Sequence, residues 1–155
     1  MKISAQEEYG LRCLLQLGRR PGEMLTIRDI AQAEGLSREY VAKLMRLLRR
    51  AGLVRSVRGQ AGGYVLPRPL EKITVAEALE ALGGRLWEPD FCRQHPGLRN
   101  FCSHQRDCLV QWLWRRVQDA VDDVLRNITL RDLLERRLFA QQAPADEVTF
   151  PVLPS

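Results

Sequence analysis

Hydrophobic residues recur every three or four positions in several stretches of the chain, which is the spacing of one face of an α-helix. Four of these stretches begin with a Ser or Thr that is followed three residues later by an acid: Ser4–Glu7, Thr26–Asp29, Thr74–Glu77 and Thr129–Asp132. Such a pair is typical of a helix start, because the hydroxyl accepts a first-turn amide and the acid reaches back to the cap. With a fifth start at Ser37, we predict helices over residues 4–18, 26–34, 37–51, 74–82 and 129–139.

The pattern changes after Gly52, which stands where a glycine can end a helix in the left-handed conformation. Residues 53–57 alternate between apolar and polar, residues 58–63 form a glycine-rich turn, and residues 64–66 form a return strand that Pro67 stops. This arrangement predicts a β-hairpin with a flexible tip. The predicted fold class is therefore mainly α with a small β-hairpin.

Residues 83–107 show little regular pattern, and loops of this length are uncommon and usually functional. Helical spacing returns from about residue 107 to residue 128, where apolar residues share one face: Leu109, Leu113, Val117, Val121, Val124 and Ile128. Too little chain remains to cover that face, so we expect a second copy of the chain to cover it in a homodimer. We expect the tail over residues 140–155, which holds three prolines, to be disordered.

Charge divides the chain into two parts. Residues 1–70 carry 13 Lys+Arg against 6 Asp+Glu, whereas residues 71–155 carry 11 against 13. The positive excess predicts that the N-terminal part meets nucleic acid. We divide the chain into a DNA-binding domain over residues 1–82, a cysteine-containing loop over residues 83–107, a dimerisation helix with a short C-terminal helix over residues 108–139, and the tail.

Several classes of protein are disfavoured. The 155 residues contain no run of about 18 apolar residues, and the first ten lack the apolar core of a secretory signal. We therefore expect a cytoplasmic protein with no membrane partner. There is no Ser/His/Asp order, phosphate-binding loop or HExxH motif, so we expect neither an enzyme nor a small-molecule substrate.

The basic part has the element order of a winged helix-turn-helix domain: a short helix, a turn at Gly35, a second helix and a glycine-rich hairpin. In such domains the second helix enters the major groove of double-stranded DNA with its N-terminal residues nearest the bases. Arg38 can contact guanine and Glu39 can accept from cytosine, while Ser37 and Tyr40 can bind phosphate. The arginine at the wing tip can reach the minor groove. The predicted DNA-binding residues are Arg28, Ser37, Arg38, Glu39, Tyr40, Lys43, Arg58, Gly59, Gly62 and Gly63.

Three cysteines, Cys92, Cys102 and Cys108, fall in and just after the irregular segment, with the spacing C-x9-C-x5-C. Thiolates are soft ligands that suit iron–sulfur clusters, zinc and copper, and a loop broken by glycine and proline lets three of them converge. The spacing predicts a metal or cluster site, with a metal-free thiol switch as the alternative. Zinc held with a loop histidine, His95 or His104, is a competitor, although the loop has no tight CxxC pair.

Cys13 differs from the other cysteines. It lies among leucines in the first predicted helix. We expect a small residue in this setting to be buried in the core and to take no part in the cysteine site.

Four stretches and a C-terminal motif carry a resemblance to a known family: residues 27–31, 36–44, 50–54 and 56–66, and Ile128-Thr129-Leu130-Arg131-Asp132-Leu133. They resemble the bacterial winged-helix transcription regulators that include IscR, NsrR, RirA and CymR, over roughly residues 1–135. The resemblance implies a homodimer, a recognition helix, a wing and a long helix that crosses between subunits. Cluster-binding members have three cysteines followed by a helix with Trp, which this chain matches at Trp114. The resemblance therefore implies an iron–sulfur cluster, of either two or four irons.

The fourth ligand is where this chain departs from part of the family. IscR-like members have a His three residues after the last cysteine, where this chain has Gln111. NsrR-like members and a two-iron relative use an acid in the first helix, donated by the other subunit, and Glu8 matches that position. We expect Glu8 as the fourth ligand and His104 as the alternative, because Glu7 is already engaged at the helix cap. A second departure is Ala42, where IscR-like members carry a Glu that can read cytosine.

The predicted cluster lies between the DNA-binding domain and the dimerisation helix. A cluster bound by an acid of the other subunit would tie the two subunits together. Its loss or oxidation would change the spacing of the two recognition helices, and DNA affinity depends on that spacing. The predicted function is a sequence-specific transcription regulator, a repressor rather than an activator, that senses redox, nitric oxide or iron status.

Overall fold

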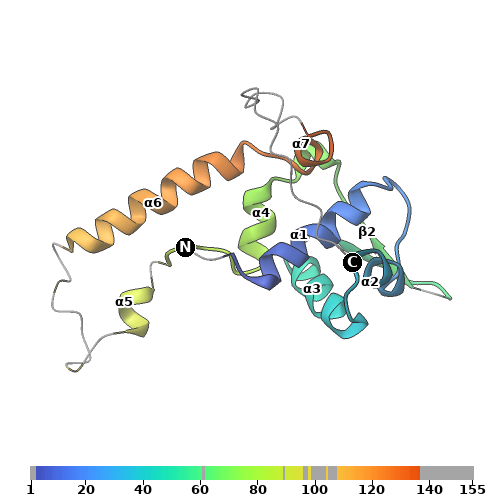
Figure 1. Ribbon diagram of the computed structural model, residues 1–155, viewed down its shortest axis with the longest axis horizontal. Coiled ribbons are helices and arrows are strands. Elements are labelled where there is room, and N and C mark those ends of the chain that lie inside the picture. Colours follow the sequence, from blue (N-terminus) through green and yellow to red (C-terminus); the bar gives the residue numbers. More distant parts are fainter. Residues whose placement is uncertain are drawn as a thin grey trace, which may run out of the picture.

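The computed structural model describes residues 3–60, 62–88, 90–95, 98, 104 and 108–136. Within these residues the chain is mainly helical with one two-stranded antiparallel hairpin, which confirms the predicted fold class (Figure 1). In chain order the elements are α1 (Ala5–Gly18), α2 (Ile27–Glu34), α3 (Arg38–Arg50), β1 (Arg55–Val57), β2 (Gly63–Val65), η1 (Leu70–Lys72), α4 (Val75–Ala81), α5 (Phe91–Gln94), α6 (Leu109–Arg126) and α7 (Leu130–Leu134).

Local capping fixes where the helices begin. All four predicted pairs of a hydroxyl and an acid form capping boxes, in which each side chain accepts the backbone amide of the other residue. The helix α3 begins after Ser37, whose Oγ accepts the Tyr40 amide at 3.2 Å. Gly35 and Gly52 follow α2 and α3 with φ angles of 65° and 72°, which ends both helices as predicted.

The hydrophobic core lies among α1, α2, α3, α4 and α7. Fully buried side chains come from each of these helices: Leu14, Ile30, Leu44, Leu48, Ala78 and Leu130. Cys13 is also fully buried, as predicted, and burial together with the charge of Glu34 raises the pKa of its thiol to about 12. The short helix α7 joins this core through the Leu130 amide, which donates to the Ile73 carbonyl at 3.0 Å.

Leu25, which lies just before α2, connects the hairpin to the helices. The strands β1 and β2 pair with Ser56 opposite Tyr64. On the other side of β2, Leu25 and Tyr64 exchange backbone hydrogen bonds of 3.0 and 2.8 Å. A Cβ at Gly63 would lie 2.8 Å from the Leu25 carbonyl oxygen, so this close approach requires glycine. The hairpin is therefore attached to the segment that immediately precedes α2.

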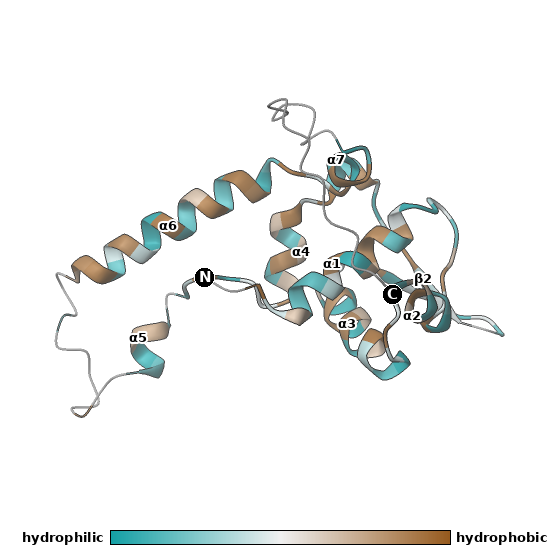
Figure 2. Cartoon of the chain, in the orientation of Figure 1, coloured by the Kyte–Doolittle hydropathy of each residue, from teal (hydrophilic) through white to brown (hydrophobic). Residues whose placement is uncertain are grey.

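The long helix α6 extends away from the body, and hydrophobic residues run along it (Figures 1 and 2). It agrees with the helix predicted between residues 107 and 128. Large apolar side chains remain exposed on it: Leu109, Val110, Trp112, Leu113, Trp114 and Val124. Exposed apolar surface concentrated on one helix indicates an interaction surface.

The structure differs from the predicted elements mainly at short helices. The sequence does not predict η1 and α5, because a helix of three or four residues is too short to show a periodic pattern. The predicted C-terminal helix is observed over Leu130–Leu134, and the predicted disordered tail lies outside the described residues. In the described part of the chain, no helix combines the length and the apolar composition needed to cross a bilayer.

Candidate functional site

The start of α3 presents residues predicted to read DNA. The exposed residues among them are Ser37, Arg38, Glu39 and Lys43. Ser37 caps the helix through its Oγ as an acceptor, which leaves its hydroxyl proton available for donation. Tyr40 is half-buried, and its ring packs edge-on against Tyr9 of α1 with the ring centroids 6.1 Å apart. Tyr40 therefore also joins α3 to α1.

A groove between α2, α3 and the hairpin brings several predicted DNA-binding residues together. Its lining includes Arg28 at the start of α2, Arg38 at the start of α3, and Gly62 and Gly63 of the hairpin. Ser56 of β1 lines the same groove and was not predicted, although its place in an alternating strand was an available signal. Two guanidinium groups beside bare glycine backbone suit the phosphate backbone of a nucleic acid.

The tip of the hairpin is a tight turn. Arg58 and Gly59 are exposed there, and the Gly62 amide donates to the Gly59 carbonyl at 3.2 Å. The φ of Gly62 is 55°, a conformation that other residues rarely adopt, so this turn favours glycine. The hairpin projects from the body (Figure 1). Arg58 is exposed in the turn that joins its two strands.

Two of the three predicted thiol ligands lie within the described residues. Cys92 is half-buried in α5, and Cys108 is half-buried at the N-cap of α6. The Cys108 Sγ accepts the backbone amide of Gln111 at 3.3 Å. Cys102 lies outside the described residues. Among the residues that the structure describes in this single chain, no three His, Cys, Asp or Glu side chains gather into a metal site.

The candidates for a fourth ligand lie at the surface. His95 and His104 are both exposed. Glu8 lies on α1, and its carboxylate forms an ion pair with the Arg12 guanidinium at 2.8 Å. Glu7 completes the capping box of α1, which confirms its predicted role. The Nε and Nη2 atoms of Arg12 both contact the Oε1 atom of Glu8.

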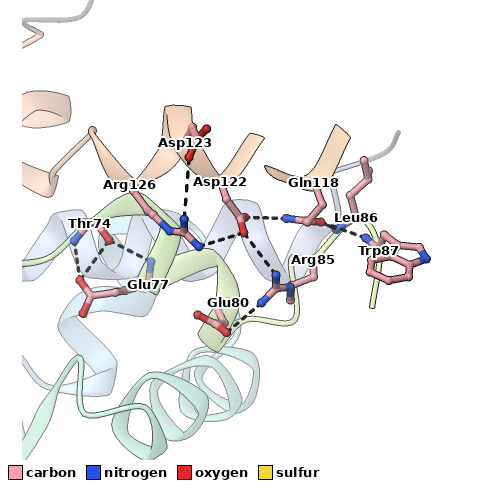
Figure 3. A network of polar contacts seen from close by, with 10 residues as sticks. All are labelled: Thr74, Glu77, Glu80, Arg85, Leu86, Trp87, Gln118, Asp122, Asp123 and Arg126. Carbon is pink, nitrogen blue, oxygen red and sulfur yellow. Dashed lines mark hydrogen bonds and ion pairs between the residues drawn. The ribbon is translucent and has the colours of Figure 1, made fainter. Parts of the chain in front are cut away.

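A network of polar contacts joins α4, the segment that follows it and α6 (Figure 3). The Gln118 Oε1 on α6 accepts the amides of Leu86 and Trp87 at 2.8 and 3.0 Å. The Gln118 side-chain amide donates to Asp122 at 2.7 Å, and Asp122 lies 3.4 Å from Arg85. The segment that leads from α4 to α5 is thus bound to α6.

The sequence matches the profile of Rrf2, described as an iron-dependent transcriptional regulator, over residues 3–136. The chain belongs to the Rrf2 family. It is 37% identical to the HTH-type transcriptional regulator CymR of Bacillus subtilis over 135 residues, which are 86% of this chain and 89% of CymR. Among solved structures, IscR of T. potens matches 94% of each chain with a TM-score of 0.68 and 31% identity. The oxidized form of Staphylococcus aureus CymR matches 87% of this chain and 97% of that one, with a TM-score of 0.62 and 36% identity.

The match to Rrf2 spans every described helix and strand, from α1 to α7. This Rrf2 protein is a helix-turn-helix transcriptional regulator and not an enzyme. Its identity to IscR is close to its identity to CymR. An assignment of a cofactor within the Rrf2 family must therefore rest on the residues of this chain.

Proposed function

We propose that this Rrf2 protein is a homodimeric repressor that binds specific DNA sites and responds to an iron–sulfur cluster held by its cysteine segment. The observation that carries the DNA-binding part is the groove in which Arg28 and Arg38 converge beside the glycines of the wing. The excess of 13 Lys+Arg over 6 Asp+Glu in residues 1–70 supports the same surface.

Each exposed residue of this surface has a distinct role in the proposal. Helix α3 lies in the major groove, with Arg38 and Glu39 at the base edges. Arg28 and Lys43 bind phosphates on either side and set the register of the protein on the duplex. Arg58 at the wing tip enters the minor groove, where its affinity depends on groove width.

Selection of binding sites from a random DNA pool tests this surface. We expect a roughly palindromic site and an affinity that falls steeply with salt, because bound phosphates release counterions. Arg58→Ala should weaken binding about tenfold, most strongly where an A·T-rich minor groove faces the wing. Gln60→Ala, at the same exposed tip, is the matched control. Equal affinity of Arg58→Ala and wild type on such sites would refute the wing assignment.

The apolar side of α6 supports the homodimer. Five residues on it repeat at alternating intervals of four and three positions: Val110, Trp114, Val117, Val121 and Val124. This is the spacing of a coiled-coil seam, in which a second helix with the same repeat covers the first. Val117, Val121 and Val124 line one apolar groove along α6, into which side chains of a second α6 can pack.

The cysteine segment has donors that fit an iron–sulfur cluster. The Cys108 Sγ already accepts a backbone amide, and hydrogen bonds to sulfur are among the features that tune such clusters. We propose Cys92, Cys102 and Cys108 as three ligands and Glu8 of the second subunit as the fourth, with His104 as the alternative. When bound, a cluster supplies a centre that reacts with oxidants, nitric oxide or a change in iron supply.

In the proposal, the Glu8 side chain couples cluster binding to DNA affinity. In the proposal, Glu8 leaves Arg12 and joins α1 of one subunit to the cysteine segment of the other. That link sets the distance between the two α3 helices, and this distance must match the spacing of the DNA half-sites. With Glu8 returned to Arg12, the link is absent and the DNA affinity changes.

Anaerobic purification with an absorption spectrum and iron and sulfide analysis tests the cofactor. We expect a brown protein that loses iron when Cys92, Cys102 or Cys108 is replaced by Ala. Cys13→Ala is the matched control, because Cys13 is fully buried in the core and should leave the iron content unchanged. Full iron loading in any of the three variants would remove that residue from the site.

A metal-free thiol switch is the second candidate function. Cys92 and Cys108 both lie outside the hydrophobic core, and an oxidized form is known for the related Staphylococcus aureus CymR. A colourless protein whose DNA affinity changes reversibly with thiol oxidation would establish this candidate. A colourless protein with one bound zinc per subunit would instead indicate a zinc site.

A further inference from the structure

We propose that Gln118 is a positioning residue that fixes the segment before Cys92 on α6 and so keeps Cys92 within reach of Cys108. The inference rests on the proposed function in one respect, namely that these two cysteines act on a common ligand. The hydrogen bonds and ion pairs that support it lie within the network of Figure 3.

Burial makes the Gln118 side chain unusual. It is 4% exposed and is the one buried polar side chain among the residues that the structure describes. Burying an amide costs free energy unless its polar atoms are satisfied. Its Oε1 accepts the amides of Leu86 and Trp87, which lie 32 and 31 positions away in the chain. A leucine would fill the same space, so the distinct contribution of the glutamine is to bind the backbone of that segment.

The orientation of the Gln118 amide is fixed by its other contacts. The Nε2 donates to the Asp122 carboxylate at 2.7 Å, and a flipped amide would set its NH2 against two N–H donors and its oxygen against a carboxylate. Arg85 and Arg126 each lie 3.4 Å from Asp122 and hold that carboxylate in place. Arg85 also reaches Glu80 of α4 at 3.4 Å. Contacts from α4, from Arg85 and from α6 thus orient the Gln118 Oε1 toward the amides of Leu86 and Trp87.

Trp87 completes the attachment of the segment. It is 9% exposed, and the Arg115 guanidinium of α6 lies 5.7 Å from its ring centroid. Trp87 stands five positions before Cys92, and Cys108 stands at the start of α6, ten positions before Gln118. Both ends of the chain between Trp87 and Cys108 are therefore attached to the same helix.

This double attachment determines how often the two thiols meet. A loop with both ends fixed on one helix holds its groups at a higher effective concentration than a loop released at one end. Replacing Gln118 with Leu removes the acceptor and leaves two amides unsatisfied, so the segment detaches more often. We therefore expect any reagent or ligand that must bind both thiols to react more slowly with Cys92 and Cys108.

Cross-linking of the iron-free full chain tests this step. In a Cys102→Ala background, dibromobimane becomes fluorescent when it joins Cys92 to Cys108, and the buried Cys13 reacts slowly. We expect Gln118→Leu to lower the cross-linking rate by about threefold or more, because the effective concentration of the two thiols falls.

Two further variants separate positioning from general damage. In the double variant Gln118→Glu with Asp122→Asn, the carboxylate at position 118 still accepts the two backbone amides. The side-chain amide at position 122 can donate to that carboxylate, so we expect the cross-linking rate to be restored. Asp123→Asn, at a side chain that is 77% exposed, should leave the rate unchanged. The proposal fails if Gln118→Leu cross-links at the wild-type rate, or if the exchanged pair does not restore a lowered rate.

Hydrogen exchange on the unaltered protein gives a test that does not depend on the folding of a variant. We expect the amides of Leu86 and Trp87 to be protected as strongly as those in the middle of α6. Exchange at the rate of an unprotected amide would overturn the proposal. None of these measurements uses iron, so a protein that binds no cluster would refute the proposed cofactor and leave the role of Gln118 to be decided separately.

Discussion

At the scale of single residues, Glu77 shows how one carboxylate can fix a helix start and respond to pH. It accepts the Thr74 amide at 2.9 Å and pairs with Arg68 at 3.0 Å. Partial burial acts to raise the pKa of Glu77, but the Thr74 amide and Arg68 outweigh it and hold the pKa below its usual range. The carboxylate therefore stabilises the fold above its unfolded pKa of about 4.3, and this stabilisation is lost as pH falls through the lower folded pKa.

We expect Glu77→Gln to lower the free energy of unfolding by roughly 0.5 kcal/mol at neutral pH, since partly exposed pairs contribute little. The difference from wild type should shrink as pH falls through the lowered folded pKa of Glu77, and it should vanish once the carboxyl is protonated in the folded protein as well. Denaturant unfolding of the iron-free protein at a series of pH values measures it, with Asp123→Asn as the control. A difference that stays constant with pH would contradict the assigned role.

Two glycines of the wing, Gly63 and Gly59, differ in the space around them. A methyl group at Gly63 would meet Met24 and the Leu25 carbonyl oxygen, so Gly63→Ala should cost about 1–3 kcal/mol of stability. No atom lies within 4 Å of a Cβ at Gly59, so Gly59→Ala should change stability by about 0.5 kcal/mol or less. Denaturant midpoints compare the two. Equal stability of the two variants would show that the hairpin does not need its attachment at Leu25.

At the scale of elements, the predictable part of the fold is the part specified by neighbours in the chain. The four capping boxes join residues three positions apart, so the sequence alone locates those helix starts. The order of helices, turn and glycine hairpin likewise predicts the winged domain. The hydrogen bonds of Gln118 join residues more than 30 positions apart, and no local pattern reports such contacts. The pairing of Glu8 with Arg12 is local, but a charge pair on a helix surface carries no signal of function.

The apolar side of α6 gives a prediction at the scale of elements. Val124 is 61% exposed in the single chain, so Val124→Asp should leave the fold of each subunit intact while placing a charge in the proposed seam. We expect sedimentation to show a shift from dimer to monomer at micromolar concentration, with unchanged helix content. Asp123→Asn, on the neighbouring position, should remain dimeric. A fully dimeric Val124→Asp protein would place the dimer interface elsewhere.

At the scale of the whole molecule, the proposed sensor requires two subunits. Its proposed fourth ligand, Glu8, lies on α1, and the proposal takes this residue from the second subunit. The spacing of the cysteines predicts a metal site, but spacing along one chain cannot report a ligand that a second chain supplies. The fourth ligand is therefore the part of the site that most needs a direct test.

We expect Glu8→Ala to give a folded dimer with a labile cluster and an altered absorption spectrum. Glu7→Ala should cost a helix cap, about 1 kcal/mol or less, and leave the spectrum unchanged. His95→Ala and His104→Ala are the controls within the loop. A normal spectrum in Glu8→Ala together with bleaching in His104→Ala would place the fourth ligand in the loop, and the proposed link between subunits would lose its basis.

The burial of Leu130 has a consequence for how the protein is made and degraded. This fully buried side chain follows the whole cysteine segment and α6, so the core is incomplete while the ribosome is still synthesising them. Loss of one buried leucine costs about 2–5 kcal/mol, a large share of the roughly 5–15 kcal/mol that stabilise a domain. A nascent or proteolysed fragment that ends before α7 therefore exposes core leucines and is a substrate for quality-control proteases. We therefore expect that a DNA-binding fragment that lacks the segments after it does not accumulate in the cell.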